Sequence, residues 1–216
     1  MEKINAELLI FDLDGTLIDS SHDIAWAANM TMKSMGYDGL DLEAIKESIG
    51  WGVKPLLEKL MPKEGPEAIE AARGRFLELY GGHLVVETYL YPGVRETIEY
   101  FLAEDKKIAI VTNKPVKLAV RILAELGMDS QFLLVLGGDS LANKKPHPEP
   151  VEKTFTSLGV SPSLSVMIGD SPIDCEAGKS AGIKTIGVTY GYRGHEELTC
   201  CDAVVDSFPG LKDVIL

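Results

Sequence analysis

The sequence predicts an α/β fold, a doubly wound parallel sheet with a small helical domain inserted after its first strand. Short apolar runs alternate with helix-length amphipathic segments, as in chains of βαβ units. Runs such as "KIAIVT", "FLLVLG" and "SVMIGD" are nearly continuous, which is typical of strands buried on both faces. The first run ends at Phe11 and the second begins at Lys107. The segment between them is far longer than one crossover helix needs.

Six segments are predicted as buried strands because they are short, apolar and bounded by turn residues. They are Glu7–Phe11, Lys107–Thr112, Phe132–Leu136, Ser165–Ile168, Thr185–Val188 and Ala203–Val205.

The chain between the first two strands shows helical periodicity. Apolar residues recur there at spacings of three and four, as at Leu56, Leu57 and Leu60, with glycines and prolines between the segments. We expect helices at Asp23–Met35, Leu42–Ser48, Lys54–Leu60 and Glu67–Tyr80. The predicted division is a core of residues 1–17 and 84–216 and a helical domain of residues 18–83.

Net charge and the lengths of the apolar segments disfavour several classes of protein. The 216 residues carry a net charge of −12, which disfavours binding to nucleic acid or to anionic lipid. No apolar segment approaches the roughly 20 residues of a membrane span, and the N-terminus does not resemble a secretory signal. Cys200 and Cys201 are expected to stay free thiols. We therefore expect a cytoplasmic protein with no membrane or nucleic-acid partner, a monomer or a homodimer.

Polar residues follow the ends of the core strands. In chain order they are Asp12 and Asp14, Thr112 and Asn113, Lys144 and Lys145, and Asp170 and Asp174. The carboxyl ends of parallel strands meet at one edge of a sheet, where open α/β folds bind ligands. We expect these side chains to form one site.

Each of these polar residues also has an ordinary structural explanation. Asp14-Gly15 alone is a common turn, Thr112 could cap the next helix, and Lys145 before a proline could be a solvated loop residue. Asp170, followed by Ser171 and Pro172, could simply mark the start of a helix. Their occurrence in order at successive strand ends favours an active site.

A cluster of carboxylates needs cations. Two carboxylates about 5 Å apart repel by roughly 3 kcal/mol at an effective dielectric near 20. Lysine offsets part of this charge, and an open site made of oxygen ligands suits Mg²⁺, which pairs naturally with a substrate phosphate.

The strings "DLDGT", "VTN", "KKPHPEP" and "GDSPID" together resemble the four motifs of the haloacid dehalogenase superfamily, in order over the whole chain. Within that superfamily, "IGWGVKPLLEKL", "YPGV" and "GGDSLANKKPHPEP" look most like phosphoglycolate phosphatases. The resemblance implies a helical cap domain over a Rossmann-like core.

The resemblance also implies residue roles. Asp12 would be the nucleophile that forms an aspartyl-phosphate, and Asp14 the general acid and base. Thr112 and the N–H of Asn113 would hold phosphoryl oxygens, and Lys145 would neutralise charge. An acid at Asp14 favours phosphate transfer over dehalogenation, because a leaving halide needs no proton.

For the metal, the resemblance implies that Asp12, Asp14 through its main-chain carbonyl, and Asp170 would ligate Mg²⁺. Asp174 would be a further ligand or would support the others. Asp19 and Ser20 are expected to cap the following helix.

Gly50, Trp51 and Gly52 resemble the substrate-specificity loop of the family's cap. The alternative is a turn in which Trp51 merely packs. The sequence leaves open whether Arg193 or the basic residues of the cap contact substrate.

The predicted function is a Mg²⁺-dependent phosphomonoester hydrolase acting on a small phosphorylated metabolite, with 2-phosphoglycolate as the first substrate hypothesis. A sugar-phosphate phosphatase or phosphoglucomutase-like enzyme, or a pyrophosphate or nucleotide phosphatase, would use the same chemistry. An alternative of a different class is a non-catalytic module that binds phosphate or metal.

Overall fold

The computed structural model describes residues 3–216. Its main sheet has six strands in the order β5-β4-β1-β6-β7-β8, with every neighbouring pair parallel. In chain order these are β1 (Leu8–Phe11), β4 (Lys107–Val111), β5 (Leu134–Leu136), β6 (Ser165–Gly169), β7 (Lys184–Val188) and β8 (Ala203–Val205). The six predicted strands are confirmed, with ends that differ by at most two residues.

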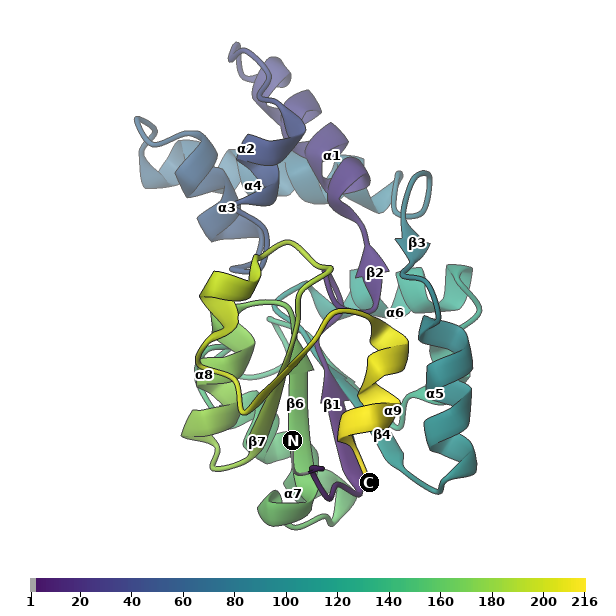
Figure 1. The fold of residues 1–216 in the computed structure, drawn as a ribbon. Coiled ribbons are helices and arrows are strands. Elements are labelled where there is room, and N and C mark those ends of the chain that lie inside the picture. Colours follow the sequence, from purple (N-terminus) through teal and green to yellow (C-terminus); the bar gives the residue numbers. More distant parts are fainter. Residues whose placement is uncertain (1–2) are drawn as a thin grey trace.

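Helices cover both faces of this sheet, which confirms the doubly wound fold (Figure 1). Alternate residues of β1 enter different cores, because successive side chains of a strand point to opposite faces. Leu9 and Phe11 share one core with α5 (Val94–Ala103), α6 (Val116–Glu125) and α9 (Leu211–Val214). Leu8 and Ile10 share the other with α7 (Glu149–Leu158) and α8 (Pro172–Ser180).

Four helices form a separate group beyond the carboxyl edge of the sheet (Figure 1). They are α1 (Ser21–Ser34), α2 (Leu42–Lys46), α3 (Val53–Leu60) and α4 (Pro66–Gly81), and we call this group the cap. The four helices predicted for this segment are confirmed, again to within two residues at each end. Helix α4 packs against both α1 and α3. The domain boundaries proposed from the sequence stay a prediction.

A two-stranded antiparallel ribbon joins the cap to the core. It pairs β2 (Ile18–Asp19) with β3 (Tyr89–Leu90). Buried Asp23 at the start of α1 accepts backbone N–H groups from Val86, Glu87 and Thr88, which fixes the returning chain. The sequence did not predict this ribbon, because strands of two residues leave no alternation to detect.

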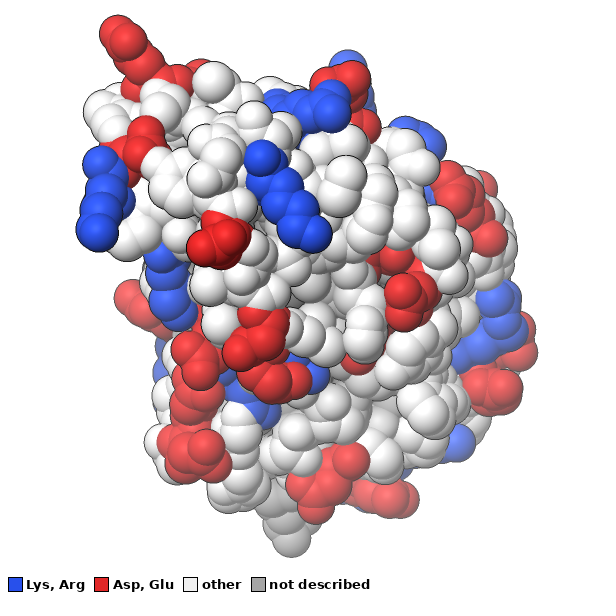
Figure 2. All heavy atoms as spheres, turned by 90° about the horizontal axis from the view of Figure 1, so that it is seen from above, with Lys and Arg blue, Asp and Glu red and all other residues white. Residues whose placement is uncertain are grey.

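The remaining elements are short 3₁₀ turns: η1 (Asp129–Gln131), η2 (Pro162–Leu164), η3 (His195–Leu198) and η4 (Phe208–Gly210). In the chain from residue 3 onward, none of the helices combines the length and apolar character needed to cross a membrane. On the cap side of the molecule, Lys and Arg are interspersed with Asp and Glu, so that face carries no large basic patch (Figure 2).

The expectation that Cys200 is a free thiol is wrong. Cys200 forms a disulfide with Cys175 of α8, their Cα atoms 6.3 Å apart, while Cys201 stays free. The pairing depends on how α8 packs against a loop 25 residues further along the chain, which cysteine spacing does not reveal.

Candidate active site

The strand ends bring three carboxylates and one lysine together in the protein interior. Asp12, Asp170 and Asp174 each offer an oxygen, and these atoms lie within 4.8 Å of one another. The ammonium of Lys145 lies 2.9 Å from Asp12 Oδ1 and 2.6 Å from Asp174 Oδ1. All four side chains are buried, so their charges are poorly screened by water.

Burial and mutual repulsion perturb this cluster. Burial raises the pKa of Asp12 from 3.8 to about 7; Asp174 adds to the rise and Lys145 opposes it. Burial also raises the pKa of Asp170, to about 8, with the charges of Asp174 and Asp12 adding to the effect. Burial works against the charge of Lys145, but Asp12 and Asp174 more than offset it and raise the pKa of Lys145. One lysine is not enough to keep three carboxylates ionised.

Asp170 and Asp174 are held by the segment between β6 and α8. Asp174 accepts the backbone N–H and the hydroxyl of Ser171, which forms a capping box at the start of α8. Asp170 accepts the backbone N–H of Tyr192 at 2.7 Å. Both carboxylates are therefore fixed before any ligand binds.

Gly15 allows the first loop to approach this cluster closely. Its φ is +88°, a backbone conformation that residues other than glycine rarely adopt. A Cβ at this position would clash with the Asp170 carboxylate. The glycine after Asp14 is thus required by the packing of the β1 loop against the β6 loop.

Asp14 lies in a different environment from Asp12. Its carboxylate accepts the Ser20 hydroxyl and pairs with the ammonium of Lys114 at 2.6 Å. Burial works against the charge of Lys114, but the Asp14 carboxylate more than offsets this, and the pKa of Lys114 is raised. Ser20 stands at the N-cap position of α1 as expected, but its side chain makes no capping hydrogen bond and contacts Asp14 instead.

Sequence reasoning missed Lys114, although it stands directly after the two residues singled out in "VTNK". Lysine in a loop after a strand is usually solvated, and only the fold shows that this one is buried against a carboxylate.

The donor set fits a divalent cation. Four buried carboxylates, on Asp12, Asp14, Asp170 and Asp174, face two ammonium groups, on Lys114 and Lys145. The formal excess is two negative charges, equal and opposite to the charge of one divalent ion. Oxygen ligands of this kind are those that Mg²⁺ and similar hard cations prefer.

Thr112 and Asn113 lie at the end of β4, where the core meets the cap. The Asn113 amide donates to the carbonyl of Gly50 in the cap and to the carbonyl of Lys145, both at 2.9 Å. Its Oδ1 atom is buried without a hydrogen-bond partner among the described residues. Asn113 therefore connects the cap loop to the loop that carries Lys145.

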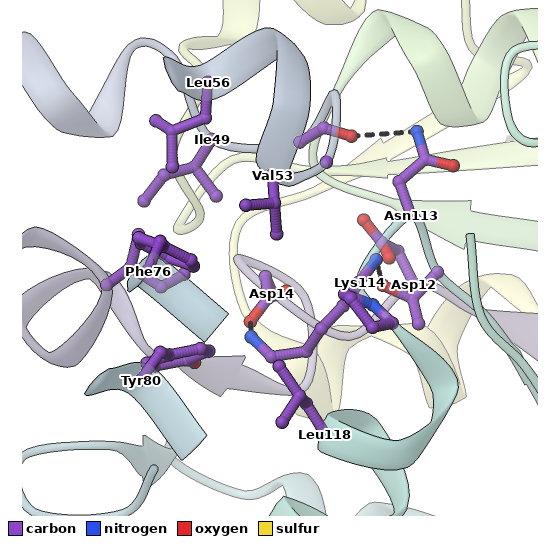
Figure 3. Close-up of a pocket in the computed structure, with 15 residues that line it drawn as sticks. Asp12, Asp14, Ile49, Val53, Leu56, Phe76, Tyr80, Asn113, Lys114 and Leu118 are labelled. Carbon is purple, nitrogen blue, oxygen red and sulfur yellow. Dashed lines mark hydrogen bonds and ion pairs between the residues drawn. The ribbon is translucent and has the colours of Figure 1, made fainter. Parts of the chain in front are cut away.

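A pocket of about 480 Å³, measured to its open mouth, lies between cap and core (Figure 3). The core contributes polar residues, among them Asp12, Asp14, Thr112, Asn113 and Lys114. The cap contributes an apolar wall that includes Ile49, Val53, Leu56 and Phe76. Polar groups placed against an apolar wall are typical of a small-molecule site.

The three residues predicted as the specificity loop do not behave alike. Gly50 and Gly52 line the pocket, and both have positive φ values. The Trp51 side chain is 45% exposed and is not among the lining residues. The Trp51 carbonyl accepts a hydrogen bond from Lys144 at 2.6 Å, a second link between cap and core.

A loop after β7 makes a third link that sequence reasoning left open. The Arg193 guanidinium donates to the carbonyls of Glu47 and Ile49, at 3.0 and 2.9 Å, just after α2. The hydroxyl of neighbouring Tyr192 accepts the Ser20 N–H at 2.9 Å. Arg193 thus touches the cap rather than the carboxylate cluster.

The chain matches the model of the haloacid dehalogenase-like hydrolases over residues 9–188. That span covers most of the core and the whole cap, so the chain belongs to this family of hydrolases.

Similar proteins of known family support this assignment. A phosphoglycolate phosphatase of Colwellia psychrerythraea is 41% identical over 199 residues, which cover 89% of this chain and 88% of that protein. The crystal structure of a predicted phosphoglycolate phosphatase from Haemophilus somnus has a TM-score of 0.92 at 31% identity, over 97% of this chain and 98% of that one. The predicted family and the likeness to phosphoglycolate phosphatases are confirmed.

A third similar structure is CbbY from Rhodobacter sphaeroides in complex with xylulose-(1,5)bisphosphate. It has a TM-score of 0.84 at 26% identity and covers 98% of this chain and all of that one. This relative holds a sugar bisphosphate, whereas the two proteins above are named for phosphoglycolate.

Proposed function

We propose that the chain is a Mg²⁺-dependent phosphatase that hydrolyses 2-phosphoglycolate through an aspartyl-phosphate on Asp12. The observation that carries this proposal is the separation of two nearby carboxylates into different environments. Asp12 lies with Lys145 in the carboxylate cluster, whereas Asp14 lies beside Lys114 at the pocket. Two acids with different neighbours suit the two roles of nucleophile and proton carrier.

In the first step, Asp12 attacks phosphorus and the bond to the ester oxygen breaks. Asp14, which takes up a proton when the anionic substrate binds, gives that proton to the leaving oxygen. In the second step, the Asp14 carboxylate takes a proton from water, whose oxygen attacks phosphorus and frees Asp12. Lys145 offsets the charge of Asp12 and of the phosphoryl group, and Thr112 and the Asn113 N–H hold phosphoryl oxygens.

Asp12, the main-chain carbonyl of Asp14 and Asp170 would hold the metal, and Asp174 would orient Lys145 and support the cluster. Bound Mg²⁺ would neutralise charge on the phosphoryl oxygens. The apolar cap wall would exclude bulk water from the phosphoenzyme.

The named relatives support 2-phosphoglycolate as substrate. The CbbY complex supports a second candidate, a sugar phosphate. Pyrophosphate and nucleotides, and a module that binds without catalysis, are further outcomes to be tested.

The test is phosphate release from 2-phosphoglycolate, hexose phosphates, pyrophosphate and nucleotides, with Mg²⁺ and again with chelator. The proposal expects the highest kcat/KM for 2-phosphoglycolate and loss of turnover with chelator. A higher value for a hexose phosphate would replace the substrate, and no turnover of any ester by folded protein with Mg²⁺ would contradict the enzyme.

A further inference from the structure

The pocket contains two donors that the proposed reaction does not use. One is the ammonium of Lys114, the single basic side chain among the pocket-lining residues of the described chain. The other is the hydroxyl of Tyr80, near the end of α4 in the cap. The remaining cap residues at the pocket offer only apolar side chains and the glycine backbone.

Tyr80 is unusual because its hydroxyl is buried and makes no hydrogen bond of ordinary geometry among residues 3–216, although the ammonium of Lys114 lies beside it. The residue is only 2% exposed. Burial raises the pKa of Tyr80 to about 12, so the phenol keeps its proton at neutral pH and is a donor. Buried donors without an acceptor destabilise folded proteins and are rare in native structures.

Lys114 lies beside the ring of Tyr80. Its ammonium lies 4.8 Å from the centre of the Tyr80 ring, and both residues border the same pocket (Figure 3). An ammonium has three N–H donors, and one of them is used by Asp14. Lys114 can therefore bridge Asp14 and a second anion.

We propose that Lys114 and Tyr80 bind the carboxylate of the leaving group, so that the site selects small phosphate esters with a single carboxylate. This proposal rests on the proposed function and specifies its substrate class. The carboxylate accepts one hydrogen bond from the ammonium and one from the phenol, and so supplies an acceptor for the Tyr80 hydroxyl proton.

The rest of the pocket supports this specificity. Ile49, Val53, Leu56 and Phe76 offer no partner to those hydroxyl groups of a hexose that would face the cap wall and be buried there unsatisfied. A second phosphate group would bring two negative charges to a wall with one cation. A short acid fits both the charge and the apolar surface.

The test compares two substrates of similar size, 2-phosphoglycolate and 2-hydroxyethyl phosphate, which lacks the carboxylate. The quantity measured is the ratio of their kcat/KM values. We expect Tyr80→Phe to lower this ratio roughly tenfold, the effect of one hydrogen bond to a charged group. Lys114→Met should lower it further.

The control is Tyr37→Phe. Tyr37 is also a cap tyrosine, but its hydroxyl already has Glu64 as a partner and it does not line the pocket. This variant should keep the wild-type ratio. Tyr80→Phe should melt close to wild type, because the hydroxyl it removes makes no hydrogen bond of ordinary geometry within residues 3–216.

An unchanged ratio in both Tyr80→Phe and Lys114→Met, with 2-phosphoglycolate still turned over, would overturn the carboxylate site alone. Wild-type turnover of 2-hydroxyethyl phosphate but not of 2-phosphoglycolate would overturn the proposed substrate and this site together. If Lys114→Met does not fold, the kcat/KM ratio of Tyr80→Phe alone tests the proposal, because that variant removes a single oxygen atom and should fold.

Discussion

Replacing Lys145 by methionine should cost both activity and stability. Methionine keeps much of the length of the side chain but removes the ammonium that lies 2.9 Å from Asp12 and 2.6 Å from Asp174. Lys145 is 1% exposed, so water cannot replace it without a rearrangement. In the absence of metal, the variant leaves the buried carboxylates of Asp12 and Asp174 without their shared cation.

The size of the effect follows from these distances. At an effective dielectric near 20, each pair is worth about 6 kcal/mol of attraction, much of which offsets the cost of burying the charges. Breaking a buried pair by removing one partner typically costs about 3–5 kcal/mol. For a chain of this length, that corresponds to a melting temperature lower by roughly 6–20 °C.

The assay is thermal unfolding of metal-free protein at pH 8 and pH 5. The difference between wild type and Lys145→Met should be smaller at pH 5, because Asp12 and Asp170, whose pKa values are raised to about 7 and about 8, are then protonated. The control is Lys145→Met with Asp174→Asn, which should regain stability but not phosphatase activity. Equal melting temperatures of wild type and Lys145→Met at pH 8 would refute the reasoning.

Two further predictions concern the metal and the cap. Asp12 and Asp170 have pKa values raised from 3.8 to about 7 and about 8. Between these limits the folded, metal-free protein holds more protons than the unfolded chain, so its free energy of unfolding falls as pH rises through about 7 and 8. Mg²⁺ should therefore raise the melting temperature more at pH 8 than at pH 6; equal shifts would contradict this. Arg193→Met should loosen the segment after α2, lower kcat/KM roughly tenfold through lost charged hydrogen bonds and speed proteolysis near residues 50–52. Wild-type kinetics and proteolysis would contradict the role of Arg193.

Much of the fold could be predicted because it depends on local patterns. The apolar runs of β1, β4 and β6 and the helical periodicity of α1, α3 and α4 are properties of short segments. The carboxylate cluster was predictable for a related reason, since the ends of parallel strands must meet at one edge.

The remaining features depend on contacts between distant segments. Lys114 and Tyr80 meet because α4 of the cap packs above the end of β4, and Arg193 reaches the cap only through the loop after β7. The Cys175–Cys200 disulfide likewise needs α8 beside the loop that follows η3. No spacing in the sequence encodes these approaches.

The central claim is that Asp12 carries the phosphoryl group, and trapping it there is the most direct test. Asp14→Asn should still be phosphorylated by 4-nitrophenyl phosphate, whose leaving group needs little help from an acid, but should be unable to activate water. We predict a burst of nitrophenol equal to the enzyme present, with phosphate on the Asp12 peptide by mass spectrometry after an acid quench. A burst that leaves Asp12 unmodified, or phosphate on another residue, would contradict the account.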